Sequence, residues 1–300
     1  MKKLCIKIAV LCVLVAISIL GIIVLLPFPE HWYNFALIDK HRILETTPSP
    51  KLVLAGGSNL AFGIDSAALA SAFDMPVVNA GLHAGLGLGR ILDDVSPFLK
   101  NGDVLLIVPE YGHFIRSWNG EESVYEFIFD VRQYRLVRSP YYSLPDNFSG
   151  YILNKVSIIK SRFIPPNPHA YSRYGFNIYG DYIQHLSMEN QEFAPEKYMG
   201  AVNHAYLAQF FRFVDHFTAQ GIVVALSYPS YEEQSFHASA KTIAELDAAL
   251  RSKENLLVIS NPESYCFHAA LFYDTRYHLN AAGRQRRTTQ LITDFLAGRT

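Results

Sequence analysis

The sequence predicts an α/β fold in which a doubly wound parallel sheet carries helices on both faces. Several short runs are apolar along their whole length, as expected of strands that are buried on both sides. These runs alternate with longer segments that have helical spacing, and many end in glycine or another small residue. We expect strands at 52–55, 76–79, 103–108, 222–227 and 256–260, and helices at 65–73, 86–99, 206–220, 238–251 and 280–296.

Composition places the chain among folded proteins. Half of its 300 residues are hydrophobic and 18% are charged, which is the reverse of the balance in disordered chains. With 26 basic and 27 acidic residues the net charge is −1, so the basic surplus that nucleic-acid binding requires is absent. We therefore expect no nucleic-acid partner. Three cysteines are too few for a disulfide scaffold or a four-cysteine zinc site.

The N-terminus predicts a membrane anchor. Residues 8–26 form an uncharged apolar run of 19 residues. As a helix this run spans roughly 28 Å, close to the thickness of a bilayer core. Lys2, Lys3 and Lys7 precede it, which places the N-terminus in the cytoplasm and residues 30–300 outside a single-pass inner or plasma membrane. The alternative is a cleaved signal peptide, although the run is long for one and no A-x-A site follows.

The rest of the chain divides into three parts. After the anchor, 1–29, which Pro27 and Pro29 end, we expect a stalk over 30–50 and one α/β domain over 51–300. Within this domain, residues 115–200 interrupt the alternation of strands and helices and are rich in Tyr, Phe, Pro and Asn. An insertion of this size is usually functional. We interpret it as a lid or substrate-binding segment, and the alternative is a packing elaboration without substrate contact.

Three motifs follow the expected strands in an order that suggests acyl chemistry. The first strand ends in Gly56-Gly57-Ser58, a sharp turn that exposes the serine hydroxyl. The second ends in Asn79-Ala80-Gly81, where a backbone N–H can approach an oxyanion. Asp274 and His278 stand just before the last helix. A serine becomes a nucleophile when an imidazole takes its proton and a carboxylate orients that imidazole.

Together these motifs resemble those of the SGNH/GDSL hydrolase superfamily, over about residues 51–114 and 202–298. The chain looks closest to membrane-anchored members linked to acylation of cell-envelope polymers. The resemblance implies a flavodoxin-like sandwich with Ser58 as nucleophile, His278 as general base and Asp274 as its partner. It also implies an oxyanion hole formed by the backbone N–H groups of Ser58 and Gly81, and neither a metal nor a cofactor.

The chain departs from the family pattern at three places. Gly57 stands where an Asp usually precedes the serine, and Asp274 and His278 are four residues apart instead of three. The Asn that normally follows the third strand is missing from residues 109–113, and Glu110 there is no simple replacement because its charge would repel an oxyanion. We expect Asn79 or Asn59 to substitute for it, or the activity to be weak or specialised.

Other polar and aromatic side chains near the strand ends are candidates for substrate contact. They are His83, Glu110, Tyr111, His113 and Arg276, and for the histidines an ordinary loop role is the alternative. His185 lies in the 115–200 segment and is expected to be structural. A glycine-rich stretch at 85–89 fits neither dinucleotide-binding nor P-loop patterns.

The resulting functional hypothesis is a membrane-anchored, extracytoplasmic serine esterase or O-acyltransferase. It would move an acyl group, acetyl in the first instance, on a cell-envelope glycan or related polymer through an acyl-enzyme. The alternative is a catalytically degenerate accessory protein that binds an envelope polymer or partners a membrane acyltransferase.

Overall fold

The computed structural model describes residues 1–26, 28–137, 139–140, 142–161 and 171–297. Five parallel strands form the main sheet in the order β2-β1-β3-β4-β6. They are β1 (Leu52–Gly56), β2 (Val77–Asn79), β3 (Val104–Val108), β4 (Val223–Leu226) and β6 (Leu257–Val258). A second, two-stranded parallel sheet pairs β5 (Tyr231–Glu232) with β7 (Cys266–Phe267).

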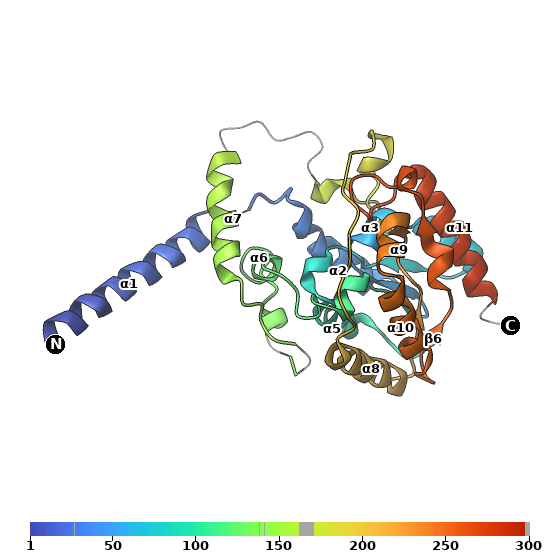
Figure 1. Cartoon of the computed structure of the whole chain (residues 1–300), viewed down its shortest axis with the longest axis horizontal. Helices are drawn as coiled ribbons and strands as arrows, with labels where there is room; N and C mark the ends of the chain where they lie inside the picture. The colour runs from blue at the N-terminus through green and yellow to red at the C-terminus, as the bar shows by residue number, and fades with distance from the viewer. Residues whose placement is uncertain (27, 138, 141, 162–170, 298–300) are drawn as a thin grey trace.

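The helices lie around the main sheet except for α1 (Lys2–Leu25), which projects away from it (Figure 1). The others are α2 (Ala36–Thr46), α3 (Ser58–Gly63), α4 (Ser66–Phe73), α5 (Leu88–Val95), α6 (Ser123–Phe129), α7 (Phe148–Ser161), α8 (His204–Ala219), α9 (Glu233–Ala238), α10 (Ala240–Arg251) and α11 (Ala281–Ala297). The expected helix at 238–251 corresponds to α10, with the short α9 before it, and that at 86–99 is shortened to α5.

Both faces of the main sheet are buried, because alternate side chains of each strand enter different cores. Leu52 and Leu54 of β1 pack with residues of α4 and α11, whereas Val53 and Ala55 pack with residues of α2, α5 and α8. This explains why the strands are apolar at every position rather than at every second one. The predicted α/β class with a parallel sheet is therefore confirmed.

The parallel sheet brings the expected motifs to one edge. The carboxyl ends of β1, β2 and β3 lie side by side, since β1 pairs with both of the others. Ser58 follows β1, Gly81 follows β2 and Glu110 follows β3. Ligand sites of open α/β sheets lie at this edge.

Residues 30–50 are not a stalk, which corrects the expectation for this segment. They contain α2, and Leu37 and Leu44 of this helix are 3% and 1% exposed within the larger core. Lys40 is also buried, and its ammonium group donates to the carbonyl oxygens of Asn79 and Gly180 at 2.8 and 2.6 Å. The sequence suggested a stalk because the segment contains charged residues such as Lys40, whose burial depends on tertiary contacts that the sequence does not show.

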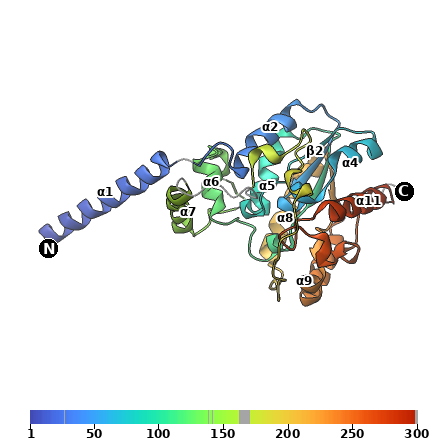
Figure 2. The ribbon, with the colours of Figure 1, turned by 90° about the horizontal axis from the view of Figure 1, so that it is seen from above.

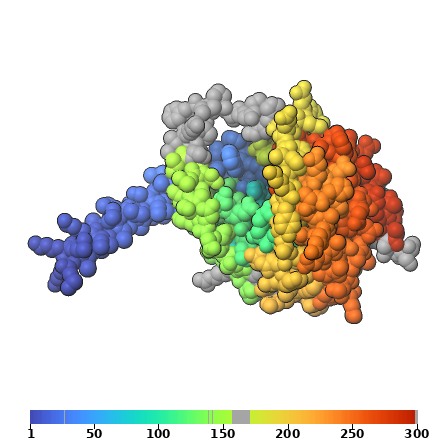
Figure 3. All heavy atoms as spheres, in the orientation of Figure 1, coloured from blue at the N-terminus to red at the C-terminus, as the bar shows by residue number. Residues whose placement is uncertain are grey.

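Helix α1 stands away from the packed body of the molecule (Figure 2 and Figure 3). It is apolar and long enough to cross a membrane or to serve as a signal sequence. None of the side chains in this helix is buried. Of the two prolines expected to end it, Pro27 lies outside the described residues and Pro29 follows the last helical turn.

The segment between β3 and α8 holds α6 and α7, and residues 162–170 within it lie outside the described part of the chain. Lys155 of α7 pairs with Asp130 at 2.5 Å, and both side chains are nearly inaccessible. Further along, Tyr171 and Tyr182 pack beside Phe62 of α3. The segment thus reaches the carboxyl edge of the sheet.

Candidate active site

Ser58 is the first residue of α3, directly after the turn that ends β1. Glycine is needed at position 56, because a Cβ there would lie 2.3 Å from the carbonyl oxygen of Val108. The tight passage from strand to helix leaves the Ser58 hydroxyl at the sheet edge. The Ser58 N–H belongs to the first turn of a helix, where backbone donors lack partners within the helix.

His278 and Asp274 complete a hydrogen-bonded chain with Ser58. His278 Nε2 lies 2.8 Å from Ser58 Oγ, and His278 Nδ1 lies 2.8 Å from Asp274 Oδ1. An ionised Asp274 accepts from Nδ1–H, so Nε2 is left to accept the serine proton. The structure brings the three predicted side chains together, and Ser58 and His278 are within hydrogen-bonding distance.

The spacing of four residues between Asp274 and His278 is accommodated by a turn. The hydroxyl oxygen of Thr275 accepts from the backbone N–H groups of Tyr277 and His278, at 3.2 and 3.1 Å. The Tyr273 N–H donates to the His278 carbonyl at 2.7 Å, which closes the turn. Asp274 therefore reaches the imidazole directly, and no backbone carbonyl takes its place.

Two aromatic residues that the sequence analysis missed hold the triad. The ring of Phe62 stacks on the His278 imidazole, with centroids 4.2 Å apart and planes 10° apart. Tyr171 donates its hydroxyl to Asp274 Oδ2 and lies 3.3 Å from His278 Nδ1. Phe62 follows Ser58 by one helical turn, which is a local signal. Tyr171 is distant in sequence and had only the aromatic richness of its segment as a signal.

The electrostatics favour an ionised carboxylate beside the histidine. Burial alone would raise the pKa of Asp274, but hydrogen bonds from His278 and Tyr171 outweigh that effect and lower the pKa. A charged Asp274 stabilises the imidazolium that forms when His278 accepts a proton. The arrangement of Ser58, His278 and Asp274 is therefore suited to take the proton from a serine hydroxyl.

The asparagines and the glycine expected at the oxyanion hole are engaged elsewhere, which corrects that part of the prediction. The Gly81 N–H donates to Asn79 Oδ1 at 3.0 Å. The Asn79 amide donates to the Leu60 carbonyl at 3.0 Å and to Asp181 at 2.8 Å. The Asn59 amide donates to the Val108 carbonyl at 3.1 Å. Of the donors expected at the oxyanion hole, the backbone N–H of Ser58 remains as the candidate.

A cavity of about 320 Å³ surrounds Ser58 and His278, and we call it the serine cavity. Of the predicted substrate contacts, four line it: His83, Glu110, His113 and Arg276. Arg276 forms an ion pair with Glu196 across the cavity wall, at 3.3 Å. Burial raises the pKa of Glu110 to about 7. An acyl group of modest size fits such a space.

Tyr111 does not contact the serine cavity, which corrects the prediction for this residue. It is 1% exposed, and its ring packs against those of Tyr228 and Tyr231. An aromatic ring three residues beyond a buried strand can belong to the core or to a site, and the ring of Tyr111 belongs to the core.

The additional histidines are held neutral by their surroundings. Burial lowers the pKa of His83, His113 and His185 to about 4 in each case. His113 accepts from the Glu110 N–H at 3.2 Å through Nδ1, and its Nε2 donates to the Ala84 carbonyl at 3.1 Å. His185 Nε2 donates to the Leu279 carbonyl at 2.9 Å, a structural role as expected. Within the described residues, no group of His, Cys, Asp and Glu side chains is arranged to hold a metal ion.

No protein-family model and no curated protein matches this chain. The geometry and chemistry of the site therefore carry the functional assignment.

Proposed function

We propose that the chain is a membrane-anchored, extracytoplasmic serine esterase or O-acyltransferase. Its reaction moves an acyl group, acetyl in the first instance, on a cell-envelope glycan or related polymer. The observation that carries this proposal is the chain of hydrogen bonds from Ser58 through His278 to Asp274, with both links at 2.8 Å. That arrangement has the geometry of a nucleophile, a base and an orienting carboxylate.

The reaction would proceed through an acyl-enzyme. Ser58 Oγ attacks the carbonyl carbon of the ester while His278 Nε2 takes the hydroxyl proton, and Asp274 stabilises the imidazolium. The bond to the leaving alcohol then breaks, and His278 returns the proton to that alcohol. In the second half, water or an acceptor hydroxyl attacks the acyl carbon and gives its proton to His278. The bond from that carbon to Ser58 Oγ then breaks, and His278 returns the proton to Ser58.

Membership of the SGNH/GDSL superfamily is part of the proposal, and the topology supports it. The parallel sheet has the doubly wound order in which the second strand is at the edge. The serine follows β1, the Asn-Ala-Gly motif follows β2, and the Asp/His turn precedes α11. This order matches the family's three motifs.

The proposed location rests on α1 and on the charges around it. Lys2, Lys3 and Lys7 lie at the start of this helix, which favours an N-terminus in the cytoplasm and a catalytic domain outside. A domain tethered there meets the polymers of the cell envelope. We propose a membrane acyltransferase as the partner, because such an enzyme would supply the acyl donor from the other side of the membrane.

A second candidate is an accessory protein that binds a polymer without turning it over. One observation favours it: the Gly81 N–H and the Asn79 amide, both expected to stabilise an oxyanion, bond within the protein. The intact triad favours the enzyme, because a decayed site has no need to keep His278 at 2.8 Å from Ser58.

Labelling with a fluorophosphonate tests the proposal. This reagent phosphonylates serines that an adjacent base activates. We expect mass spectrometry of the full chain to locate the adduct on Ser58, and Ser58→Ala and His278→Ala to lose it. Ser66, which bonds to Asp181 and lies outside the site, provides the matched control Ser66→Ala. Absence of an adduct on Ser58 would favour the accessory role.

A further inference from the structure

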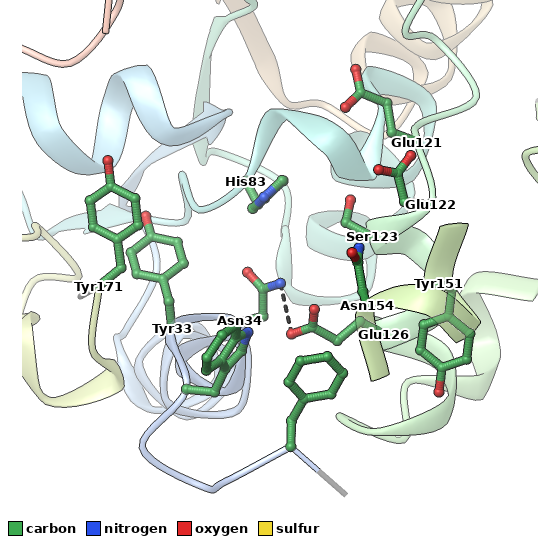
Figure 4. A pocket seen from close by; sticks show the side chains of 12 residues that line it. Tyr33, Asn34, His83, Glu121, Glu122, Ser123, Glu126, Tyr151, Asn154 and Tyr171 are labelled. Carbon is green, nitrogen blue, oxygen red and sulfur yellow. Dashed lines mark hydrogen bonds between the residues drawn. The ribbon is translucent and has the colours of Figure 1, made fainter. Parts of the chain in front are cut away.

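A second cavity lies beside the serine cavity and has a volume of about 440 Å³. This volume is within the range of roughly 300–1,000 Å³ found for small-molecule sites. Aromatic residues form much of its wall (Figure 4), namely Phe28, Trp32, Tyr33, Tyr151 and Tyr171. Carboxyl and amide groups share that wall, namely those of Glu121, Glu122, Glu126, Asn34 and Asn154. We call it the aromatic cavity.

The aromatic cavity adjoins the triad. His83 and Glu121 line both cavities. Tyr171, on the wall of the aromatic cavity, donates its hydroxyl to Asp274. A molecule that fills the aromatic cavity is therefore separated from the catalytic groups by single side chains.

Two buried polar atoms on the wall have no hydrogen-bond partner among the described residues, Asn34 Oδ1 and Ser123 Oγ. Asn34 is 4% exposed, and its Nδ2 donates to Glu126 Oε1 at 2.9 Å. Its amide oxygen is thereby fixed as an acceptor. Burying a polar atom without a partner is unfavourable, and such atoms in a cavity wall indicate a polar ligand.

Glu126 adds a group that both donates and accepts. It is 8% exposed. Burial raises its pKa to about 8, although hydrogen bonds from Asn34 and Trp32 act in the opposite direction. At pH 7 its carboxyl is therefore largely neutral, and a neutral carboxyl can pair with a hydroxyl in either sense.

We propose that the aromatic cavity binds one ring of an uncharged saccharide, and that an adjoining part of the same saccharide reaches Ser58 in the serine cavity. Aromatic faces attract the weakly positive C–H faces of a sugar ring. Asn34, Ser123 and Glu126 supply acceptors and donors for its hydroxyls. Glu121 and Glu122 add negative charge, which disfavours phosphate-rich polymers and anionic lipid headgroups.

This inference rests on the proposed function and names the acceptor class for it. The sugar oxygen attacks the acyl carbon on Ser58, the bond from that carbon to Ser58 Oγ breaks, and the sugar proton passes through His278 to Ser58. Phe28 and Trp32 follow shortly after α1, so a membrane-embedded α1 would hold the cavity near the membrane surface.

Intrinsic fluorescence offers a test by binding alone. The chain has two tryptophans, Trp32 on the cavity wall and Trp118, which is 1% exposed. The full-length Ser58→Ala variant in nanodiscs is titrated with N-acetylglucosamine trimer, with cellotriose and with a short-chain phosphatidylglycerol. We expect a saturable change with a saccharide and none with the lipid. Glu126→Ala should weaken the binding at least tenfold, and Glu192→Ala, at an exposed position, less than twofold.

A second test separates binding from chemistry. In full-length protein, Trp32→Ala should raise the KM for a saccharide acceptor about tenfold and lower kcat by a smaller factor. Tyr174→Ala, at a residue 74% exposed, is the matched control. The inference fails if neither saccharide binds saturably, if Glu126→Ala binds as tightly as its parent, or if the lipid binds instead. Saturable saccharide binding without Ser58-dependent turnover would reject the proposed function and leave the binding site standing.

A separate observation concerns Glu110 and the missing oxyanion donor. Glu110 follows β3 at the place where the family resemblance expects an Asn. Its Oε1 lies only 2.9 Å from the position that a Cβ on Gly57 would take. The Glu110 carboxyl therefore fills the space beside Gly57, the residue before Ser58. It lines the serine cavity together with Ser58 and His278.

The surroundings of Glu110 favour a neutral acid up to about pH 7. Burial raises its pKa to about 7. Positive charge on His278, a hydrogen bond from the Asn59 N–H and the charge of Arg276 act in the opposite direction, and Glu121 adds to the increase. With one carboxyl oxygen accepting from Asn59, the other can hold the proton.

We infer that Glu110, in its protonated form, donates a hydrogen bond to the oxyanion of the acyl-transfer intermediate. It thereby supplies the donor that Asn79 and Gly81 do not. This inference also rests on the proposed function. The proton stays on Glu110 throughout, so the step adds stabilisation without a transfer.

The pH dependence of p-nitrophenyl acetate hydrolysis tests this role. We expect kcat/KM of the full-length protein to decrease above pH 7. Glu110→Gln, which keeps an N–H donor, should stay within tenfold of the parent and lose that decrease. Glu110→Ala should lose about 10²- to 10³-fold. A rate that increases through pH 7, with Glu110→Gln as inactive as Glu110→Ala, would make Glu110 a base and overturn the inference. An infrared carboxylic-acid band at pH 6 that is missing in Glu110→Gln gives a readout without turnover.

Discussion

Tyr171 donates its hydroxyl to one oxygen of Asp274, and His278 bonds to the other oxygen at 2.8 Å. The carboxylate is thus held from both sides, and its plane is fixed relative to the imidazole. Tyr171 comes from the long segment between β3 and α8 and also forms part of the aromatic cavity. One tyrosine therefore connects the orientation of the triad to the wall of the adjoining cavity.

Removing that hydroxyl should slow the reaction without abolishing it. A hydrogen bond to a charged group is worth about 1.5–3 kcal/mol, and part of that supports the orientation of His278. We expect Tyr171→Phe to lower kcat for p-nitrophenyl acetate about tenfold. Tyr174→Phe, at an exposed tyrosine nearby in sequence, should leave kcat unchanged. An unchanged kcat in Tyr171→Phe would show that His278 alone orients the carboxylate.

Asp274→Asn should have a larger effect. An amide at this position can hold the imidazole in the tautomer that carries its proton on Nε2, which cannot accept from Ser58. We expect kcat to decrease about 10³- to 10⁴-fold, as in other serine triads. Asp65→Asn, at a helix cap remote from the site, is the matched control and should change kcat less than twofold. A decrease of tenfold or less would indicate that Asp274 has no essential part in the chemistry.

Much of the fold and the triad could be predicted from sequence because both depend on local signals. Short apolar runs locate β1, β2 and β3, and a parallel sheet then places Ser58 at the shared edge. The Asp/His turn before α11 is likewise a local feature. Tyr171 could not be found in this way, since it is separated from His278 by 107 positions and its place depends on tertiary packing. The expectation that Asn79 and Gly81 donate to an oxyanion was also wrong. A sequence motif does not show that these groups form hydrogen bonds within the protein, such as that from the Gly81 N–H to Asn79 Oδ1.

Buried neutral histidines should make the protein sensitive to acid. Burial holds the pKa of His113 and His185 at about 4 in the folded state, against 6.5 for a solvent-exposed imidazole. Between these pH values the unfolded chain binds more protons, so stability is complete above about pH 6.5 and is lost as the pH falls toward 4. Each histidine contributes a slope of up to about 1.4 kcal/mol per pH unit.

Urea unfolding of the full chain in detergent, measured from pH 7 to pH 4.5, checks this expectation. His185→Gln keeps a donor for the Leu279 carbonyl and should flatten the pH dependence. His204→Gln, at a side chain 75% exposed, should leave the slope unchanged. An equal slope in His185→Gln and its parent would contradict a neutral buried imidazole.

The orientation of the domain can be tested with cysteine labelling. Cys5, Cys12 and Cys266 are the three cysteines, and replacing each with serine gives a background free of thiols. In that background Glu192→Cys should react with a membrane-impermeant maleimide in intact cells, whereas Lys3→Cys should react only after lysis. The reverse pattern would place the domain in the cytoplasm. The mass of the purified chain shows in the same preparation whether α1 is retained.

Gly57→Ala should disturb the site through steric contact alone. A Cβ at position 57 would lie 2.9 Å from both Glu110 Oε1 and the Ala84 Cβ, closer than such contacts normally approach. The backbone of Gly57 is in the extended region, so alanine carries no conformational penalty there. We expect kcat/KM for p-nitrophenyl acetate to decrease at least tenfold and its decline above pH 7 to shift, because the Glu110 carboxyl must move. Gly63→Ala is the matched control, since its Cβ would meet only Leu279, at an ordinary 3.6 Å. If Gly57→Ala and Gly63→Ala have the same kcat/KM, the close approach of Glu110 to Gly57 is not needed for the reaction.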